Sequence, residues 1–379
     1  MHVLASKESM SKEPPLPVKS LPSPIRHSHI LKAQKSDGCA TGGRRILSYY
    51  TFATGVEESE LRKHHPVLYL HGFPGSGVEA ALYANAAVKS QCQLFGIDRP
   101  GFGCSSPSPS ADWNNPDAYV QSFVSDIWDF VRAMGWKSFS IIGVSGGGPY
   151  ALAILDSYLK SKLGDGCSAG RAIQCNLEAV SIVAGVFGTA GSQGMMPSNQ
   201  KLMVISSLRG WKSSLAHFGL LLLVSIQRLI LLNILLRIFS EKRLLKMATS
   251  SAMKDLPDCD KQVFLDDEAV GLAFLGDAKE ALRQSAAPAV LEAKVLFREG
   301  YYFEQGLKEN WAAINETKLP RATLFQGHRD VNVPPAHSQF VHENIFGGKG
   351  ASLVEFNDMG HLSLVIKKAD EVMKSVARK

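Results

Sequence analysis

Ser145 stands in a run of glycines, Gly143-Val144-Ser145-Gly146-Gly147, directly after the apolar residues FSII. The run satisfies the pattern G-x-S-x-G, which by itself is common. Its surroundings are more specific, because a strand-like segment precedes it and a helix-like segment, PYALAILDSYL, follows it. A sharp turn there would expose the serine hydroxyl, and the N-terminus of the following helix would favour developing negative charge. Ser145 is therefore either a catalytic nucleophile or a residue that only fills a tight turn.

Short apolar runs alternate with helix-like segments through the first half of the chain. The strand-like runs are RILSYYTFA, PVLYLHGFP, QLFGIDRPGFG, FSIIGVS and AVSIVAGVFG. Such alternation predicts an α/β fold with a mostly parallel sheet and helices on both faces. Active sites of these sheets lie at the carboxyl ends of the strands, and the polar, glycine-rich clusters of this chain fall there.

The alternation stops near Gly188, and mostly helical sequence follows until RATLFQGHRD resumes a strand. One more strand, SLVEFNDMGHLS, and an amphipathic helix at Leu364–Ala377 complete the chain. We predict a disordered N-terminal tail at residues 1–43, a first core part at 44–188, a helical cap at 189–318 over the carboxyl edge of the sheet, and a second core part at 319–379. The tail is rich in Ser, Pro and Lys and lacks the apolar run of a secretory signal.

Two further clusters accompany the serine turn. HGFPGSG at His71–Gly77 and DRPGFGCS at Asp98–Ser105 each follow a strand-like run. With the G-x-S-x-G turn, in this order and spacing, they make the chain resemble the α/β-hydrolase superfamily, in its branch with a serine nucleophile, an HGFP-type oxyanion loop and a helical cap. The resemblance covers roughly residues 45–188 and 318–379, and it implies the α/β-hydrolase fold.

The resemblance also implies a catalytic triad in the order serine, acid, histidine. Asp330 follows the strand after the cap and would be the acid, and His361 follows the last strand and would be the base. The less common acid position of the family, after the strand that ends at Gly188, holds FGTAGSQG and no carboxylate. The alternative role of Asp330 is to form a turn or cap a helix. We expect His337 and His342 to be surface residues.

The oxyanion hole implied by the resemblance consists of the backbone N–H groups of Phe73 and Gly146. Small residues at the turn would let the strand and the helix approach closely. The residues expected to shape the site are His71, Gly72, Pro74, Gly143 and Gly147. No metal is implied, and no nucleotide cofactor either, since no GK[ST] follows the glycines.

The identity of the nucleophile narrows the chemistry. Epoxide hydrolases and haloalkane dehalogenases share the HGFP-type loop but place aspartate at the turn, so Ser145 favours acyl transfer. We expect a lipase-like esterase that cleaves a carboxylic ester with an apolar acyl or alcohol moiety. The same triad acting on an amide, a thioester or a carbon–carbon bond stays open, as does a ligand-binding member without catalysis. Proline iminopeptidases are disfavoured because their loop is typically HGGPG.

Composition limits the partners and the compartment. The 379 residues are 45% hydrophobic and 20% charged, with a formal net charge of +6, which is ordinary for a globular protein with a sizeable core. No nucleic-acid-binding motif accompanies the charge, so nucleic acid is not an expected partner. The six cysteines form no CxxC pair, which favours a cytoplasmic protein. Targeting to an organelle by the tail stays open.

The most hydrophobic stretch is Ala216–Phe239 in the cap. A membrane span needs about 20 apolar residues, and Arg228 and Arg237 interrupt this stretch. Asn233, Arg237 and Glu241 recur at four-residue spacing and predict a narrow polar stripe. A cap helix packed on the core, a lid over an acyl pocket and a peripheral contact with lipid all stay open. Residues 201–246 carry eight Lys or Arg and one acid, whereas residues 254–280 carry eight acids and three lysines.

Overall fold

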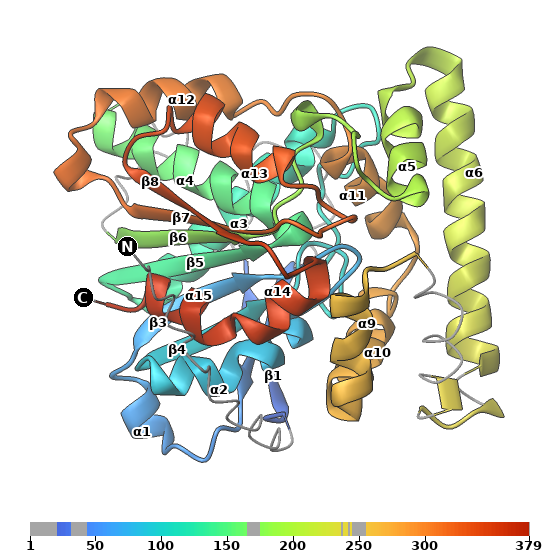
Figure 1. Cartoon of the computed structure of the whole chain (residues 1–379), viewed down its shortest axis with the longest axis horizontal. Helices are drawn as coiled ribbons and strands as arrows, with labels where there is room; N and C mark the ends of the chain where they lie inside the picture. Colours follow the sequence, from blue (N-terminus) through green and yellow to red (C-terminus); the bar gives the residue numbers. More distant parts are fainter. Residues whose placement is uncertain are drawn as a thin grey trace, which may run out of the picture.

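The structure, a computed structural model of the chain, describes residues 21–31, 44–164, 175–235, 238–241, 243–244 and 255–378. An eight-stranded sheet in the order β1-β2-β4-β3-β5-β6-β7-β8 forms its centre (Figure 1). The strands from β3 to β8 run parallel, and β2 is antiparallel to β1 and β4. The strands are β1 (Pro24–Ile30), β2 (Ile46–Phe52), β3 (His65–Leu70), β4 (Cys92–Ile97), β5 (Ser138–Val144), β6 (Asn176–Val183), β7 (Arg321–Gly327) and β8 (Ala351–Phe356). The predicted α/β fold is confirmed.

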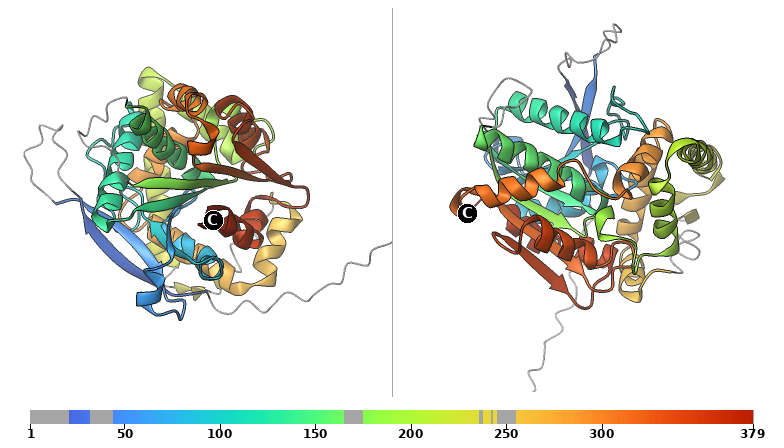
Figure 2. Two further views of the ribbon diagram at one scale, coloured as in Figure 1. Left: turned by 90° about the vertical axis from the view of Figure 1, so that its left-hand side faces the viewer. Right: turned by 90° about the horizontal axis from the view of Figure 1, so that it is seen from above.

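Helices cover both faces of the sheet (Figure 2). One apolar core lies between the sheet and α3, α4 and α12, and a second lies between the sheet and α2 and α15. Because both faces are covered, the central strands are continuous apolar runs, and Val67, Leu68 and Leu70 of β3 are fully buried. The helices of the core are α1 (Glu58–Leu61), α2 (Ala81–Lys89), α3 (Pro116–Met134), α4 (Gly148–Leu163), α12 (Glu304–Ala313), α13 (Ala336–Phe340), α14 (His361–Lys367) and α15 (Ala369–Val376).

Local sequence signals explain where the long helix α3 begins and ends. The Asn115 side chain caps its N-terminus by accepting a hydrogen bond from the Ala118 N–H, and Pro116 occupies the first turn. Gly135 follows the helix with a left-handed φ of 66°, a conformation that favours glycine. At the other end of the chain, the single helix expected at Leu364–Ala377 is instead two helices, α14 and α15, that meet at Lys368.

The cap lies beyond the carboxyl ends of the strands (Figure 1). It consists of α5 (Pro197–Ser207), α6 (Gly210–Leu229) with the π-helical continuation η4 (Ile230–Leu235), α9 (Asp258–Asp266), α10 (Glu268–Ala281) and α11 (Ala287–Leu296). Helix α12 falls inside the predicted cap range but belongs to the core. It packs against α4, and its residues Leu307 and Trp311 are buried in the main apolar cluster.

The N-terminal prediction was wrong for residues 21–31. Residues Pro24–Ile30 form β1, which pairs with β2 along its whole length, and the His27 ring stacks on Tyr49 at 5.0 Å. Most side chains of β1 are exposed, so the strand has no buried apolar alternation for sequence analysis to detect. Its position depends on pairing with β2, which local sequence does not reveal. The rest of the predicted tail lies outside the described residues.

Candidate active site

Ser145 occupies a tight turn between β5 and α4. Its φ of 50° is left-handed, which is uncommon for a non-glycine residue and is typical of strained functional turns. The two flanking glycines allow this turn. A Cβ on Gly147 would lie 2.1 Å from the Leu70 carbonyl oxygen, and one on Gly143 would lie 2.7 Å from the Gly147 carbonyl oxygen. Strand and helix therefore approach closely, as a nucleophile turn requires.

The loop after β3 lies directly beside this turn. A Cβ on Gly146 would lie 2.7 Å from the Phe73 Cβ and 3.3 Å from the Phe73 nitrogen. Within the described part of the chain, the Phe73 N–H donates to no other backbone group. The structure thus places the backbone of Phe73 and Gly146 next to Ser145, where an oxyanion hole would have to be.

His71 lies behind this loop and does not line the cavity at Ser145. Its Nδ1 is 2.8 Å from the Gly72 carbonyl oxygen, and its Nε2 accepts a 3.4 Å hydrogen bond from the Arg99 N–H. Burial and the nearby Arg99 cation hold the pKa of His71 well below its usual value. The ring therefore favours its neutral form and supports the loop through these two contacts.

Asp330 and His361 come from neighbouring strands and form a short buried contact. Asp330 follows β7, His361 begins α14 after β8, and 2.7 Å separates the His361 Nδ1 from the Asp330 Oδ2. The other oxygen of Asp330 accepts hydrogen bonds from the N–H groups of Asn332 and Val333, at 2.8 Å and 2.7 Å. Burial disfavours the His361 cation, but Asp330 together with the nearby Asp260 and Glu79 outweighs this effect and raises the pKa of His361 above its usual value.

Ser145 and His361 line the same cavity of about 230 Å³. The core contributes the turn of Ser145 and the loop after β3, and the cap contributes α5, α10 and α11. Most of the lining is apolar, with Val144, Val186, Phe274, Leu296, Phe297, Val333, Leu362 and Val365. The structure therefore brings Ser145 and His361 to one cavity between core and cap, and Asp330 contacts His361 without lining that cavity.

Two carboxyl groups of this cavity were not foreseen from the sequence. Glu79 accepts hydrogen bonds from the Gly72 N–H at 2.7 Å and the Tyr69 hydroxyl at 3.0 Å. Asp277 of α10 accepts both the N–H and the hydroxyl of Ser76, at 2.7 Å and 2.6 Å. Burial raises the pKa of Glu79, and burial together with Glu79 raises that of Asp277 well above its usual value. Asp277 thus connects the cap to the loop after β3. No sequence motif indicates Glu79 or Asp277 as a residue of the site.

A further buried carboxylate, Asp260 of the cap, holds the helix that carries His361. The Asp260 Oδ2 of α9 accepts the His361 N–H at 2.9 Å, and its Oδ1 accepts the N–H and the hydroxyl of Ser363, at 2.8 Å and 2.7 Å. These are first-turn donors of α14, which a helix leaves without internal partners. Asp260 therefore acts as an N-terminal cap supplied from another part of the chain.

We expect Asp260→Asn to lower the free energy of unfolding by about 1–3 kcal/mol, because the amide NH₂ cannot accept hydrogen bonds and one or more donors of α14 lose their partner. Denaturant unfolding followed by circular dichroism measures the change. Asp258→Asn on the same helix is the matched control, since the Asp258 side chain is 98% exposed and should have a much smaller effect. Equal losses in the two variants would contradict the capping role of Asp260.

A buried ion pair supports the loop after β3 from the other side. The Arg99 guanidinium contacts the Glu292 carboxylate of α11 through Nε at 2.5 Å and through a terminal nitrogen at 2.9 Å. It also donates to the carbonyl oxygens of His71 and Gly72, at 2.5 Å and 2.9 Å. Both charged side chains are fully buried. The pair links the cap to the backbone that precedes Phe73.

Two histidines after Asp330 were expected at the surface, and a polar stripe was expected in the cap. His337 is buried, not a surface residue. Its Nδ1 accepts the Phe187 N–H at 2.9 Å, and burial lowers its pKa to about 4. His342 is half-buried. The predicted polar stripe cannot be followed, because Arg237 and the Asn233 side chain lie outside the description.

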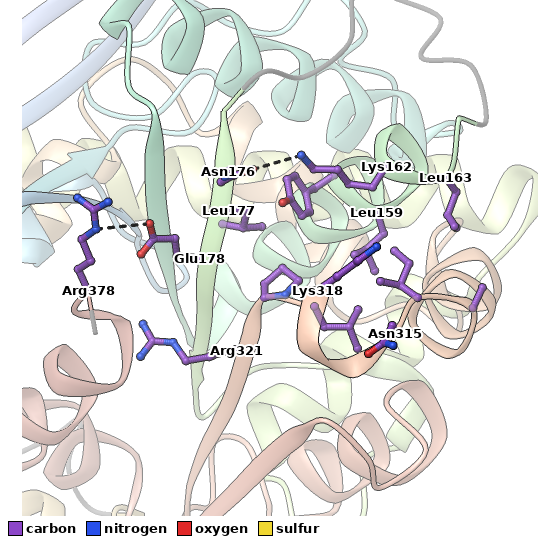
Figure 3. Close-up of a pocket in the computed structure, with 15 residues that line it drawn as sticks. Leu159, Lys162, Leu163, Asn176, Leu177, Glu178, Asn315, Lys318, Arg321 and Arg378 are labelled. Carbon is purple, nitrogen blue, oxygen red and sulfur yellow. Dashed lines mark hydrogen bonds and ion pairs between the residues drawn. The ribbon is translucent and has the colours of Figure 1, made fainter.

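A larger cavity, of about 870 Å³, lies at the opposite end of the sheet, near the amino ends of β6 and β7 (Figure 3). At its rim the Lys162 Nζ donates to the Asn176 Oδ1 at 3.2 Å, and the Arg378 Nε lies 3.9 Å from the Glu178 Oε1. Its described lining residues include no serine, cysteine or histidine. The cavity at Ser145 is therefore the candidate active site despite its smaller volume.

Comparison with known proteins agrees with this architecture. The family model described as alpha/beta hydrolase fold matches residues 65–167, the segment that holds the loop after β3 and the turn of Ser145. No curated protein shows significant sequence similarity to the chain.

Solved structures share the fold at low sequence identity. A carboxylesterase structure from the thaumarchaeon Nitrososphaera gargenis is 12% identical, with a TM-score of 0.51, over 86% of this chain and 92% of that one. A haloalkane dehalogenase from Bradyrhizobium elkani is 14% identical, with a TM-score of 0.51, over 94% and 97%. An α/β-hydrolase enzyme from a Medee basin deep-sea metagenome is 13% identical, with a TM-score of 0.51, over 88% and 95%. The chain therefore has the α/β-hydrolase fold.

Proposed function

We propose that this protein is a serine hydrolase that cleaves a carboxylic ester with an apolar acyl or alcohol moiety through an acyl-enzyme on Ser145. The observation that carries the proposal is the shared cavity: it is lined by Ser145, at a left-handed turn, and by His361, which is hydrogen-bonded to the buried Asp330. The carboxylesterase neighbour is in keeping with this proposal. The dehalogenase neighbour shares the fold, but serine at the turn favours acyl transfer.

The roles follow from the geometry and from general triad chemistry. His361 would take the hydroxyl proton as the Ser145 Oγ attacks the ester carbonyl carbon, and would then give that proton to the departing alcohol. Asp330 would hold the Nδ1–H tautomer and stabilise the imidazolium. The N–H groups of Phe73 and Gly146 would stabilise the oxyanion of each tetrahedral intermediate. Water activated by His361 would then release the carboxylic acid and restore Ser145.

The cavity also suggests which substrates to test first. Its apolar lining favours an apolar acyl or alcohol group, and its volume of about 230 Å³ lies below the range typical of pockets for drug-sized ligands. We expect p-nitrophenyl esters of short carboxylic acids to be hydrolysed with a higher kcat/KM than long-chain esters. Phosphonylation by a fluorophosphonate probe, with the tryptic peptide identified by mass spectrometry, should map to Ser145. A protein that neither hydrolyses any ester of the series nor reacts with the probe would refute the proposal.

The pH dependence tests the role of His361 in the same assay. The base must be neutral to accept a proton, and its pKa is raised above the usual value by Asp330. The kcat/KM should therefore fall as the pH drops through a midpoint above about 6.5, the unperturbed value for histidine. A profile that stays flat to well below that pH would exclude His361 as the base. Reaction with the probe but turnover only of an amide, a thioester or a carbon–carbon bond would point to the other chemistries of the same triad.

A further inference from the structure

Helix α6 presents an apolar face away from the rest of the molecule. Figure 2, seen from above, shows this helix end-on at the outer edge of the cap. The side chains at helical spacing along that side are between 45% and 72% exposed. They define the outer face of α6, which consists of Trp211, Leu215, Phe218, Leu222, Ile226 and Leu229. Apolar residues are also exposed just beyond it, at Ile230 and Ile234 of η4.

The opposite side of α6 is anchored to the protein, so the apolar face cannot simply turn inward. The buried Ser213 hydroxyl accepts a 2.8 Å hydrogen bond from the Trp113 indole, and the His217 ring stacks on the same indole at 4.5 Å. Near the other end, Arg228 donates to the carbonyl oxygens of Leu282 and Arg283, at 2.7 Å and 3.0 Å. The orientation of α6 is therefore set by contacts at both ends, and these contacts direct the outer face away from the core.

The length of α6 and its connections to the rest of the chain show whether this helix could cross a membrane or lie in the plane of its surface. The segment Gly210–Leu232 has a mean hydropathy of 2.0 with none of its apolar window buried, and it is the only described helix long and apolar enough to span a bilayer. However, α6 packs on α5 and α11, and the chain returns to the same body, with Leu244 buried. A single crossing would leave its two ends on opposite sides of the bilayer. An in-plane position satisfies both the hydropathy and the connectivity.

Most charged residues in and next to α6 are basic. The sequence holds no Asp or Glu between Glu178 and Glu241. Lys201 of α5 is exposed, as are Arg209 and Lys212 at the N-terminal end of α6. Beyond the other end Arg243 is exposed, and Glu241 is paired with Lys279 at 2.7 Å. A second copy of the chain packed on this helix would bring like charges together, whereas an anionic lipid surface complements them.

We propose that the outer face of α6 is a docking surface for anionic membranes, with the helix in the plane of the interface. Trp211 would lie at the headgroup level beside the basic side chains, and the aliphatic residues and Phe218 would enter the acyl boundary. The surface is connected to the active site through α5, which packs on α6, lines the cavity with Asn199 and exposes Val204. The inference concerns binding only and does not depend on the proposed hydrolase activity.

The test is flotation of purified full-length protein with phosphatidylcholine vesicles that contain or lack phosphatidylserine. Wild type should float with the phosphatidylserine vesicles and float less at high salt. Phe218→Glu/Leu222→Glu should weaken the partition coefficient at least about 100-fold, since burial of each large apolar side chain is worth about tenfold or more. Lys201→Gln/Lys212→Gln should weaken it about fivefold for each charge removed.

The matched control is Leu265→Glu/Ile30→Glu, which makes the same charge change at exposed apolar residues on other elements. It should float like wild type, and all variants should keep the wild-type circular dichroism spectrum. Failure of wild type to float, or an equal loss in the control, would overturn the proposal. Sedimentation that shows a dimer in solution, dissociated by Phe218→Glu/Leu222→Glu, would instead assign the face to self-association.

Discussion

Ser145→Ala is expected to lower ester turnover by at least about 10,000-fold and to abolish labelling by a fluorophosphonate, because no other group of the cavity can replace the attacking oxygen. Initial rates with a short p-nitrophenyl ester and gel-based labelling measure the two effects. The neighbouring Gly146 N–H and the His361–Asp330 pair stay in place in this variant. Any turnover that remains in Ser145→Ala would therefore come only from substrate binding and from stabilisation of the oxyanion by the backbone N–H groups.

Ser145→Gly separates loss of chemistry from loss of fold. The φ of 50° at this position costs a non-glycine residue about 1–2 kcal/mol, a cost that glycine does not have. We expect the glycine variant to be at least as resistant to denaturant as wild type and equally inactive. Strong residual turnover in either variant would exclude Ser145 as the nucleophile. Loss of stability in the glycine variant would contradict the strained turn.

Arg99→Met is expected to lower the free energy of unfolding by about 3–5 kcal/mol, because it leaves the Glu292 carboxylate buried without its partner. The substitution also removes the donors to the carbonyl oxygens of His71 and Gly72 that hold the loop before Phe73. Any folded Arg99→Met should therefore also show a reduced kcat if that loop forms the oxyanion hole. Denaturant unfolding and ester kinetics on the same samples measure both effects.

An exposed ion pair of the same chemistry provides the control. The terminal nitrogen of Arg62 lies 2.6 Å from Glu58, and both side chains are more than 70% exposed. Arg62→Met should leave the unfolding midpoint unchanged within error, because solvent screens such pairs. Arg99→Met/Glu292→Met should regain part of the stability lost in Arg99→Met, since no buried charge is left unpaired. Similar losses at Arg62 and Arg99 would show that burial is not the cause.

Much of this architecture could be predicted from local sequence. The strands from β2 to β8 are short apolar runs that are followed within two residues by glycine or a polar residue. The turn of Ser145 follows from small residues between a strand and a helix. The resemblance to α/β-hydrolases then indicated Asp330 and His361 as triad members, and the structure places them 2.7 Å apart. Their catalytic roles stay predictions until the kinetic tests are made.

The contacts between cap and core, unlike the strands and the turn of Ser145, could not be predicted from local sequence. Asp260 and His361 are 101 residues apart in the chain, Arg99 and Glu292 are 193 apart, and Ser76 and Asp277 are 201 apart. No periodicity or motif links residues over such separations, so a buried carboxylate of the cap looks like any other acidic residue in the sequence. The pairing of β1 with β2 was missed for the same reason.

The sequence by itself determined the α/β class, the succession of strands from β2 to β8 along the chain and the glycine-framed turn of Ser145, because these depend on local periodicity and on turn residues. Only the tertiary structure decided which carboxylates hold the loops of the candidate site and which way α6 faces. Hydropathy is the same for a helix buried in a core and for one exposed at a surface. Ser213 and Arg228 lie on the inner side of α6 and contact Trp113 and Leu282, which are distant from them in sequence. These contacts direct the apolar face of the helix outward.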